Sequence, residues 1–288
     1  MDMIKYSTIQ LLRFPFSFFL MPVYWFALGQ AGSINALDAL LVFVILHLLV
    51  YPASNGYNSY MDRDQGSIGG LKNPLQPSRQ LFWFTICMDI LAIVLSFYIS
   101  IYFVAGVSAY IISSRAYSYR GIRLKKYPIL GYLTVIFFQG AVVFWIVYHG
   151  GSANKSLAVP VVPMVASSLL IGGFYPLTQI YQHESDLKDG VRTISYLLGK
   201  KGTFIYCGIV YCIAFSFLAY YFFTTKQAKE FYIVATGMLP VLVSFFAWAR
   251  KVWGNERSAN FSNTMLINLT ASVCTNATFI IIFILHKF

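Results

Sequence analysis

Long apolar stretches separated by short polar breaks run along the whole chain. Nine such stretches lie near residues 10–29, 35–54, 81–98, 99–114, 130–148, 158–178, 203–223, 231–249 and 264–286. A membrane-spanning helix needs about 20 predominantly apolar residues, because the hydrocarbon core of a bilayer is about 30 Å thick. The pattern predicts an all-α membrane protein in which nine transmembrane helices form one bundle around a central cavity, with residues 1–288 as a single domain.

The third and fourth stretches follow each other without a polar break. Residues 80–114 contain one charged side chain, Asp89. A single helix of that length would rise about 52 Å, which exceeds the thickness of the hydrocarbon core. We therefore expect two slightly short helices joined by a tight turn, although neither Ser100 nor Gly106 fixes the position of that turn.

Composition supports this class of protein. Hydrophobic residues make up 58% of the chain and charged residues 11%, whereas a soluble domain carries about 25% charged residues. This excludes an ordinary water-soluble globule and leaves no room for a separate soluble domain. Aromatic residues make up 18% and are spread along the chain, so we expect some rings to face the interior cavity. The four cysteines lack the spacing of zinc or iron–sulfur ligands, and we interpret them as buried spacers.

The net charge of +11 is unevenly distributed. With nine spans, 17 of the 21 basic residues fall on one side of the membrane. The other side receives Lys155, Lys226, Lys229 and Lys287. Because cytoplasmic loops are enriched in Lys and Arg, this asymmetry predicts a multi-pass protein of a bacterial inner (cell) membrane, with a cytoplasmic amino terminus and an external carboxyl terminus. Membrane lipids are then the expected surroundings of this basic chain, and nucleic acid is not an expected partner.

The polar loop after the second stretch contains candidate metal ligands. Asn58 and Asp62 are four residues apart, so on a helix they share one face, and Asp64 follows closely. Oxygen ligands of this kind suit Mg²⁺, and Lys72 and Arg79 add cations that can bind phosphate oxygens. The alternative is a solvated loop with ordinary surface charges.

The polar loop after the sixth stretch has a similar pattern. Gln179, Gln182 and Asp186 are spaced by three and four residues, which predicts that they stack on one helical face. Lys188 and Arg192 add positive charge for phosphate binding. The alternative is a capped, charged helix end at the membrane surface.

A basic run lies between these two loops, at residues 116–128. It contains Tyr119, Arg123 and Lys125 among further basic residues and tyrosines. Clustered basic residues near a membrane also attract anionic lipids, at about 1 kcal/mol per residue. Diphosphate binding and lipid anchoring are therefore both open for this run.

Taken together, the three loops are similar to those of the UbiA-type intramembrane prenyltransferases, whose two motifs are written NDxxDxxxD and DxxDxxxD. Asn58 and Asp62 match the first two metal-binding positions of the first motif. The run 72–75 looks like the Lys-Asn-Arg-Pro-Leu-like stretch that follows it, and residues 117–126 look like the family's Tyr/Arg/Lys loop. The resemblance covers essentially the whole chain and implies nine transmembrane helices with both motifs on cytoplasmic loops.

The sequence lacks acids at positions where these motifs have them. Gly66 stands where the first motif has its last Asp, and Gln182 and Gln179 occupy the two earlier acidic positions of the second motif, of which Asp186 is the last. A Gln oxygen is a ligand without charge. Either metal affinity is lowered, or one Mg²⁺ is held firmly, or the chemistry has changed. The nearby acids Asp64, Glu184 and Asp189 are candidates to compensate.

The resemblance implies a prenyltransferase that moves a prenyl or polyprenyl chain from its diphosphate to a small lipophilic or aromatic acceptor, with Mg²⁺ as cofactor. The implied catalytic residues are Asn58, Asp62 and Asp186. The implied metal ligands are Asn58, Asp62, Asp64, Gln182 and Asp186. The implied diphosphate-binding residues are Lys72, Arg79, Tyr119, Arg123, Lys125, Lys188 and Arg192. The alternatives are an intramembrane terpene cyclase and a catalytically degenerate protein that binds or transports lipids.

Isolated polar residues inside apolar stretches require their own interpretation. We interpret Asp89 as a paired, structural carboxylate and Asn268 as an interhelical hydrogen-bonding residue. Arg13 either extends to the membrane surface or lines the active cavity.

Overall fold

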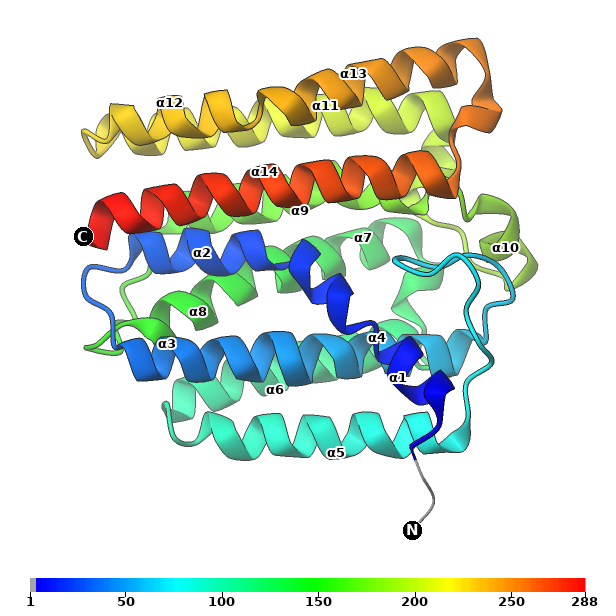
Figure 1. Ribbon diagram of the computed structural model, residues 1–288, viewed down its shortest axis with the longest axis horizontal. Coiled ribbons are helices and arrows are strands. Elements are labelled where there is room, and N and C mark those ends of the chain that lie inside the picture. Colours follow the sequence, from blue (N-terminus) through cyan, green and yellow to red (C-terminus); the bar gives the residue numbers. More distant parts are fainter. Residues whose placement is uncertain (1–3, 288) are drawn as a thin grey trace.

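The computed structural model describes residues 4–287, which are mainly helical (Figure 1). The α-helices are α1 (Tyr6–Leu12), α2 (Met21–Gln30), α3 (Ala36–Phe43), α4 (Tyr51–Asp62), α5 (Arg79–Ser96), α6 (Ile101–Ser118), α7 (Pro128–Ile136), α8 (Val143–Gly151), α9 (Val161–Gln179), α10 (His183–Lys188), α11 (Ile194–Thr224), α12 (Ala228–Gly237), α13 (Leu239–Gly254) and α14 (Phe261–Lys287). The 3₁₀ segments are η1 (Phe14–Phe19), η3 (Leu124–Lys126) and η5 (Glu256–Ser258), and the π-helical segments are η2 (Val44–Val50) and η4 (Phe137–Val142).

The long helices lie side by side in one bundle (Figure 1). Several of them join end to end, so that Ala36–Asp62, Pro128–Gly151 and Ala228–Gly254 each form one long helical span. Seven helices within residues 4–287 are long and apolar enough to cross a membrane, and an eighth is counted if Tyr6–Phe19 and Met21–Gln30, bent by 42°, form one broken span. The all-α membrane fold is therefore confirmed.

The predicted number of nine spans is not confirmed. All nine predicted stretches are helical, but α6 does not belong to the set that is apolar enough to cross a membrane. Its last two turns contain serines and Arg115, which lower its hydropathy. Nine spans therefore stay a prediction.

The division of residues 80–114 into two helices is confirmed. The helix α5 ends at Ser96 and α6 begins at Ile101. The Ser100 side chain caps α6 by accepting a hydrogen bond from the backbone N–H of Phe103 at 3.0 Å, which satisfies a donor that the helix itself leaves free. Ser100 therefore marks the turn, although its role is visible only once the helix start is known.

The interior of the bundle is packed with aromatic and aliphatic side chains. Phe26 of α2 stacks on Phe279 of α14 with 4.6 Å between ring centroids, and it meets Phe144 of α8 edge-on at 5.5 Å. A Cβ atom at Gly140 would lie 2.4 Å from the Cα atom of Ser168, so η4 approaches α9 at a distance that only glycine permits. This close packing fixes the walls that surround the functional site.

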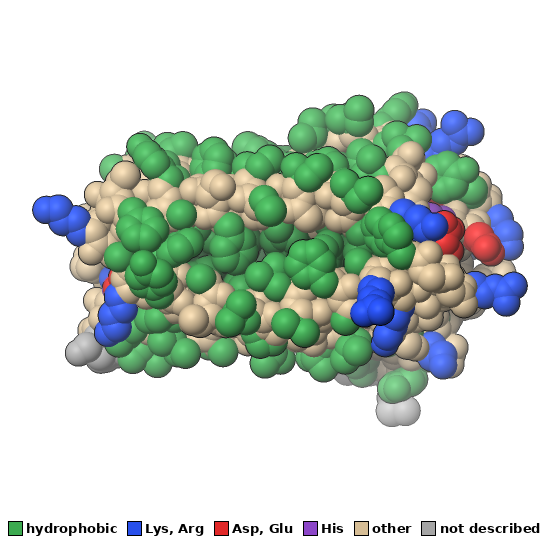
Figure 2. All heavy atoms as spheres, turned by 90° about the horizontal axis from the view of Figure 1, so that it is seen from above, with side chains coloured by type: hydrophobic (Ala, Val, Ile, Leu, Met, Phe, Trp, Pro, Cys, Tyr) green, Lys and Arg blue, Asp and Glu red, His purple; other side chains and the backbone are tan. Residues whose placement is uncertain are grey.

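The two ends of the bundle differ in the loops that they carry. The loops after α4, α6, α9 and α13 lie at one end, whereas the carboxyl terminus and the loops after α2, α5, α8 and α11 lie at the other (Figure 1). Figure 2 shows apolar side chains over the flank and charged side chains mainly toward the two ends. The sequence prediction that the three polar loops share one end is confirmed, and the membrane side that this end faces stays a prediction.

A buried ion pair joins α5 and α6. Arg115 Nε donates to Asp89 Oδ2 at 2.8 Å, and the Arg115 guanidinium also lies 3.9 Å from the centroid of the Tyr57 ring on α4. A carboxylate inside a bundle is tolerated when it is paired and hydrogen-bonded. The interpretation of Asp89 as a paired, structural residue is confirmed.

Candidate functional site

A cavity of about 210 Å³ opens at the end of the bundle that carries the polar loops. Its walls come from α4 and the loop that follows, from α6, from the α7–η4 helix, and from α9, α10 and α14. Its lining includes acidic, amide and hydroxyl side chains, and Tyr110, Phe138 and Tyr175 add aromatic surface. The expectation of an interior cavity with aromatic walls is therefore confirmed.

The end of α4 presents the first group of predicted ligands to this cavity. Asn58 and Asp62 lie one helical turn apart, and both line the cavity together with Asp64 from the following loop. Asn58 Oδ1 accepts a hydrogen bond from Ser118 Oγ of α6 at 3.2 Å. The helix ends directly after Asp62, where Arg63 adopts a left-handed conformation with φ of 56°. The predicted common face of Asn58 and Asp62 is confirmed.

The second group of predicted ligands also lines the cavity, but not from one helix. Gln179 is the last residue of α9, Gln182 precedes α10, and Asp186 lies within α10. The prediction that the three side chains stack on one helical face is wrong, because the chain leaves the helix between α9 and α10. Spacing alone does not reveal this break, since no glycine or proline lies between residues 179 and 186.

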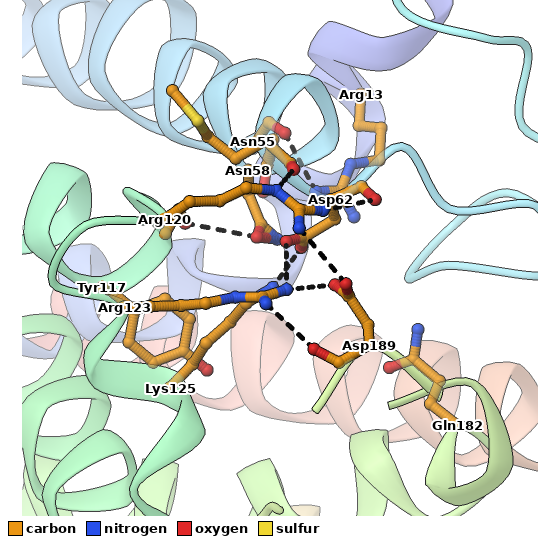
Figure 3. Close-up of polar contacts among 12 residues, drawn as sticks. Arg13, Asn55, Asn58, Asp62, Tyr117, Arg120, Arg123, Lys125, Gln182 and Asp189 are labelled. Atoms are coloured by element: carbon orange, nitrogen blue, oxygen red, sulfur yellow. Dashed lines mark hydrogen bonds and ion pairs between the residues drawn. The ribbon is translucent and has the colours of Figure 1, made fainter. Parts of the chain in front are cut away.

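Two basic residues from the loop after α6 contact the Asp62 carboxylate. Lys125 Nζ forms an ion pair with Asp62 Oδ2, and an Arg123 guanidinium nitrogen lies 3.5 Å from Asp62 Oδ1 (Figure 3). The Asp62 side chain is 5% exposed, so these contacts are shielded from water. The basic run is thus folded against the first acidic motif.

Asp189 ties the same loop to the segment after α10. Arg123 forms an ion pair with the Asp189 carboxylate and donates to its backbone oxygen at 2.9 Å (Figure 3). Arg120 lies 3.4 Å from the Asp189 carboxylate and donates to the backbone oxygen of Met61 at 2.7 Å. Asp189 therefore connects the basic run to the second motif and does not line the cavity itself.

Other predicted diphosphate-binding residues lie outside the cavity wall. They are exposed and do not belong to its lining: Lys72, Arg79, Tyr119, Lys188 and Arg192. The structure brings Lys125 into the cavity and places Arg123 against Asp62, whereas these five side chains lie in loops or at helix ends outside the cavity wall.

Burial changes the acidity of two carboxylates at the cavity. Removal from water and the neighbouring charge of Asp62 together raise the pKa of Asp64 to about 6. Removal from water raises the pKa of Asp186 to about 7, against the opposing effect of Lys125. Both raised pKa values indicate that the negative charge of these carboxylates is not fully compensated. A bound cation would neutralise this charge.

Arg13 is a cavity residue that the sequence left undecided. It is 8% exposed and lines the cavity, and its guanidinium donates to the backbone oxygens of Gly69 at 3.0 Å and Asn55 at 3.2 Å. The alternative that Arg13 lines the cavity is therefore the correct one. Its signal in the sequence was a charge within an apolar stretch, which is usually functional.

Further lining residues were missed or interpreted differently. Tyr117 and Tyr175 line the cavity from α6 and α9, and their hydroxyl groups are hydrogen-bonded to each other. Asn268 of α14 also lines it, and its amide nitrogen has no hydrogen-bond partner among residues 4–287. The interpretation of Asn268 as an interhelical hydrogen-bonding residue is therefore wrong. Only the tertiary arrangement shows which polar groups of a bundle face its cavity.

The residues of this cavity fit Mg²⁺, which prefers oxygen ligands. Carboxylate and amide oxygens line it, and two of these, Asp62 Oδ1 and Gln179 Oε1, are buried and accept no hydrogen bond in the described part of the chain. Within residues 4–287, no group of three His, Cys, Asp or Glu side chains is placed to hold a metal ion by itself. A metal ion here would therefore share its coordination with amides, water or a bound ligand.

Comparisons with known proteins agree with this architecture. The sequence matches the UbiA prenyltransferase family over residues 19–270. A search of curated proteins found no match.

Solved structures of similar proteins share the fold. A UbiA homologue from Archaeoglobus fulgidus, bound to DMAPP and Mg²⁺, has a TM-score of 0.72 and 18% identity, over 96% of this chain and 99% of that chain. An apo UbiA homologue from Aeropyrum pernix K1 has a TM-score of 0.68 and 16% identity, over 93% and 98% of the two chains. A digeranylgeranylglyceryl phosphate synthase has a TM-score of 0.61 and 19% identity, over 96% of both chains.

Proposed function

Because the chain belongs to the UbiA prenyltransferase family, we propose that it is a membrane prenyltransferase whose catalytic domain comprises residues 1–288. It transfers a prenyl or polyprenyl chain from its diphosphate to an acceptor, with Mg²⁺-assisted loss of pyrophosphate. The observation that carries this proposal is one cavity in which Asp62 and Asp186, from separate segments, lie together with Lys125. The homologue structures with DMAPP or GPP and Mg²⁺ support it.

The diphosphate binds at the mouth of the cavity, next to the basic run. Lys125 and Arg123 are already held beside Asp62, and charge-assisted hydrogen bonds from such groups to phosphate oxygens are short and strong. The exposed polar residues in the surrounding loops attract or contact the same anion: Lys72, Arg79, Tyr119, Lys188 and Arg192. Positive charge around a cavity raises the local concentration of an anionic substrate.

Oxygen donors on both sides of the cavity hold the metal. They are drawn from Asn58, Asp62, Asp64, Gln182 and Asp186. When bound, Mg²⁺ neutralises the pyrophosphate and makes it a better leaving group. We assign Asn58, Asp62 and Asp186 as catalytic residues because all three line the cavity in which the diphosphate is cleaved.

The deeper walls serve the carbon chain. When the C–O bond of the prenyl diphosphate breaks, its electron pair leaves with pyrophosphate and the first carbon of the chain becomes cationic. Tyr110, Tyr117, Phe138 and Tyr175 line the cavity, and an aromatic face stabilises a desolvated cation by about 1–2 kcal/mol. An electron-rich acceptor, which we propose to be an aromatic ring, then forms a new bond to that carbon and loses a proton.

The test is incubation of the purified protein with a prenyl diphosphate, a candidate aromatic acceptor and Mg²⁺. We expect release of pyrophosphate, a product that contains both the prenyl chain and the acceptor, and no release in the presence of a chelator. A cyclised prenyl product without a second molecule would identify a terpene cyclase. Absence of pyrophosphate release with every prenyl diphosphate tested would identify a protein that binds or transports lipids.

We also propose that the protein lies in a bacterial inner (cell) membrane and that the polar end of the bundle faces the cytoplasm. The support is the excess of basic residues in its loops. In a variant without native cysteines, Gln65→Cys and Glu184→Cys should resist a membrane-impermeant thiol reagent added to intact cells, whereas Lys229→Cys at the opposite end should react. The reverse pattern would place the site outside.

A further inference from the structure

The three carboxylates of the cavity have different surroundings. Asp62 is contacted by two cations, Lys125 at Oδ2 and Arg123 at 3.5 Å from Oδ1 (Figure 3). In the described chain, neither the Asp64 nor the Asp186 carboxylate forms an ion pair or accepts a hydrogen bond. Asp62 is therefore neutralised by the protein itself, and the other two carboxylates are left to a cation from solution.

The remaining oxygen donors carry no charge. Gln182 Nε2 donates to the backbone oxygen of Ser67 at 3.2 Å, which holds this amide against the loop after α4. Gln179 is 8% exposed, and its Oε1 is buried without a hydrogen-bond partner within residues 4–287. These two amides line the cavity, but they add no negative charge to that of the carboxylates.

Two cations already belong to the cavity wall. Lys125 lines it from the basic run, and Arg13 lines it from the opposite side, where backbone oxygens hold its guanidinium without neutralising it. A second divalent ion would lie beside these positive charges in a cavity of about 210 Å³. Three carboxylates and two side-chain cations line this space, so the protein itself leaves a single negative charge toward divalent ions, and a second divalent ion would depend on the diphosphate alone.

We propose that this site holds one Mg²⁺, bound by Asp64 and Asp186 together with the diphosphate, and that Lys125 supplies the positive charge of a second metal ion. Mg²⁺ is commonly bound by one or two carboxylates, substrate phosphates and water. Asp62 then positions the Lys125 ammonium, and Gln179 Oε1 is a neutral partner for the metal or its water. This inference rests on the proposed function, because the diphosphate completes the coordination.

The first experiment counts metal ions. Mn²⁺ replaces Mg²⁺ and is followed by electron paramagnetic resonance, which measures free Mn²⁺ in a titration of the purified full-length protein. Geranyl S-thiolodiphosphate, a slowly reacting analogue, serves as the diphosphate probe. We expect a single bound Mn²⁺ per chain at saturation. Two bound Mn²⁺ would overturn the proposal.

Substitutions identify the residues that hold this ion. Asp64→Asn and Asp186→Asn should each weaken Mn²⁺ binding by about tenfold or more, the range found when metal-site partners are removed. Glu184→Gln is the matched control, because Glu184 is an exposed acid of the same helix as Asp186 and does not line the cavity; it should bind Mn²⁺ as the wild type does. Loss of Mn²⁺ binding in Asp62→Asn but not in Asp64→Asn would overturn the assignment.

Lys125 should contribute to binding of the diphosphate analogue and not to binding of the metal ion. Lys125→Met should retain Mn²⁺ binding in the absence of the analogue and should weaken binding of the analogue. A variant that combines Lys125→Met with Gln179→Asp and Gln182→Asp removes one positive charge and adds two negative ones. It should bind a second Mn²⁺ with the analogue, and a count that stays at one would show that charge does not set the number of metal ions.

The metal count does not depend on turnover, so it separates the two proposals. One Mn²⁺ per chain without pyrophosphate release from any prenyl diphosphate would refute the proposed function and keep the metal assignment. Pyrophosphate release together with two Mn²⁺ per chain would keep the function and refute the assignment.

Discussion

The two ends of the bundle use the same charged residue types in different ways. At the end opposite the cavity, each acid has one basic partner. Lys155 binds Asp38 at 2.6 Å, and His286 lies 3.2 Å from Glu230. Both pairs join segments that are far apart in the sequence and then connect to no further charge among the described residues. These contacts are of the kind that holds loops and helix ends together.

At the cavity end the charges are not matched in this way. Asp62 and Asp189 each have two basic partners, whereas Asp64 and Asp186 have none within residues 4–287. Basic and acidic groups thus lie side by side, and groups of both kinds remain able to form further ion pairs or hydrogen bonds. This uneven pairing, and not the number of charges, distinguishes a place that can receive an anion and a metal ion from one that only stabilises the fold.

The largest difference between the ends should appear with Asp62→Ala. We expect Mg²⁺-dependent pyrophosphate release to fall by about 10²-fold or more, the scale on which loss of preorganised electrostatic groups reduces turnover. The reason is that Lys125 loses the carboxylate that holds it in the cavity. The measurement is a steady-state assay of pyrophosphate at saturating prenyl diphosphate.

Asp38→Ala is the control for this substitution at the other end. It should change the same rate by less than about twofold, because exposed pairs contribute little. Equal losses in the two variants, both well folded, would show that the comparison between the ends has no functional meaning.

The basic run should give the next largest effect. Replacing Arg123 or Lys125 by Ala should weaken binding of a prenyl diphosphate by about 1.5–3 kcal/mol, the range for hydrogen bonds to charged groups. Calorimetric titration with geranyl S-thiolodiphosphate measures this. If a folded variant with both substitutions binds the analogue unchanged, the run anchors lipid and does not bind the substrate.

A smaller effect should follow from pH. The pKa of Asp186 is raised to about 7 and that of Asp64 to about 6, so protons compete with Mg²⁺ below these values. As the pH falls from 8 to 6, the ionised fraction of Asp186 decreases by about tenfold, and the apparent Mg²⁺ affinity should fall by at least this factor. Titrations with Mn²⁺ at several pH values test the direction. An affinity that is constant or rises toward acidic pH would contradict the prediction.

The smallest effect should come from Lys155→Ala at the opposite end. Its ion pair with Asp38 is partly exposed, with side-chain exposures of 25% and 22%. We expect a loss of about 0–1 kcal/mol in the free energy of unfolding and an unchanged affinity for prenyl diphosphate. Thermal unfolding and the same calorimetric titration measure both quantities. A marked loss of substrate binding would show that charge at this end also reaches the site.

Local patterns in the sequence predicted much of this structure. Hydropathy predicted the helical stretches, and the length of residues 80–114 predicted two helices instead of one. The four-residue spacing of Asn58 and Asp62 predicted their common face, because the helix continues through both. These properties depend on a few neighbouring residues, so they can be read before the fold is known.

Tertiary partners could not be predicted in the same way. Nothing in the spacing shows that Lys125 meets Asp62 or that Arg123 binds Asp189, since these contacts depend on how the loop after α6 folds across the mouth. The break between α9 and α10 was missed for a related reason. Gln179, Gln182 and Asp186 have helical spacing, but α9 ends at Gln179, and the Gln182 side chain donates instead to the backbone oxygen of Ser67 in the loop after α4.

The π-helical segment η4 couples helix length to the contents of the cavity. It presents Phe138 and Gln139 to the cavity, while the next helix, α8, turns Phe144 into the core. A π-helical turn holds one more residue than an α-helix uses for the same rotation, so deletion of one residue within η4 would restore a continuous α-helix while the flanking helices kept their faces. The wide turn that presents Phe138 and Gln139 would close, and the packing of Phe144 in the core would remain. A single-residue deletion in this segment should therefore reshape the cavity wall and leave the fold in place.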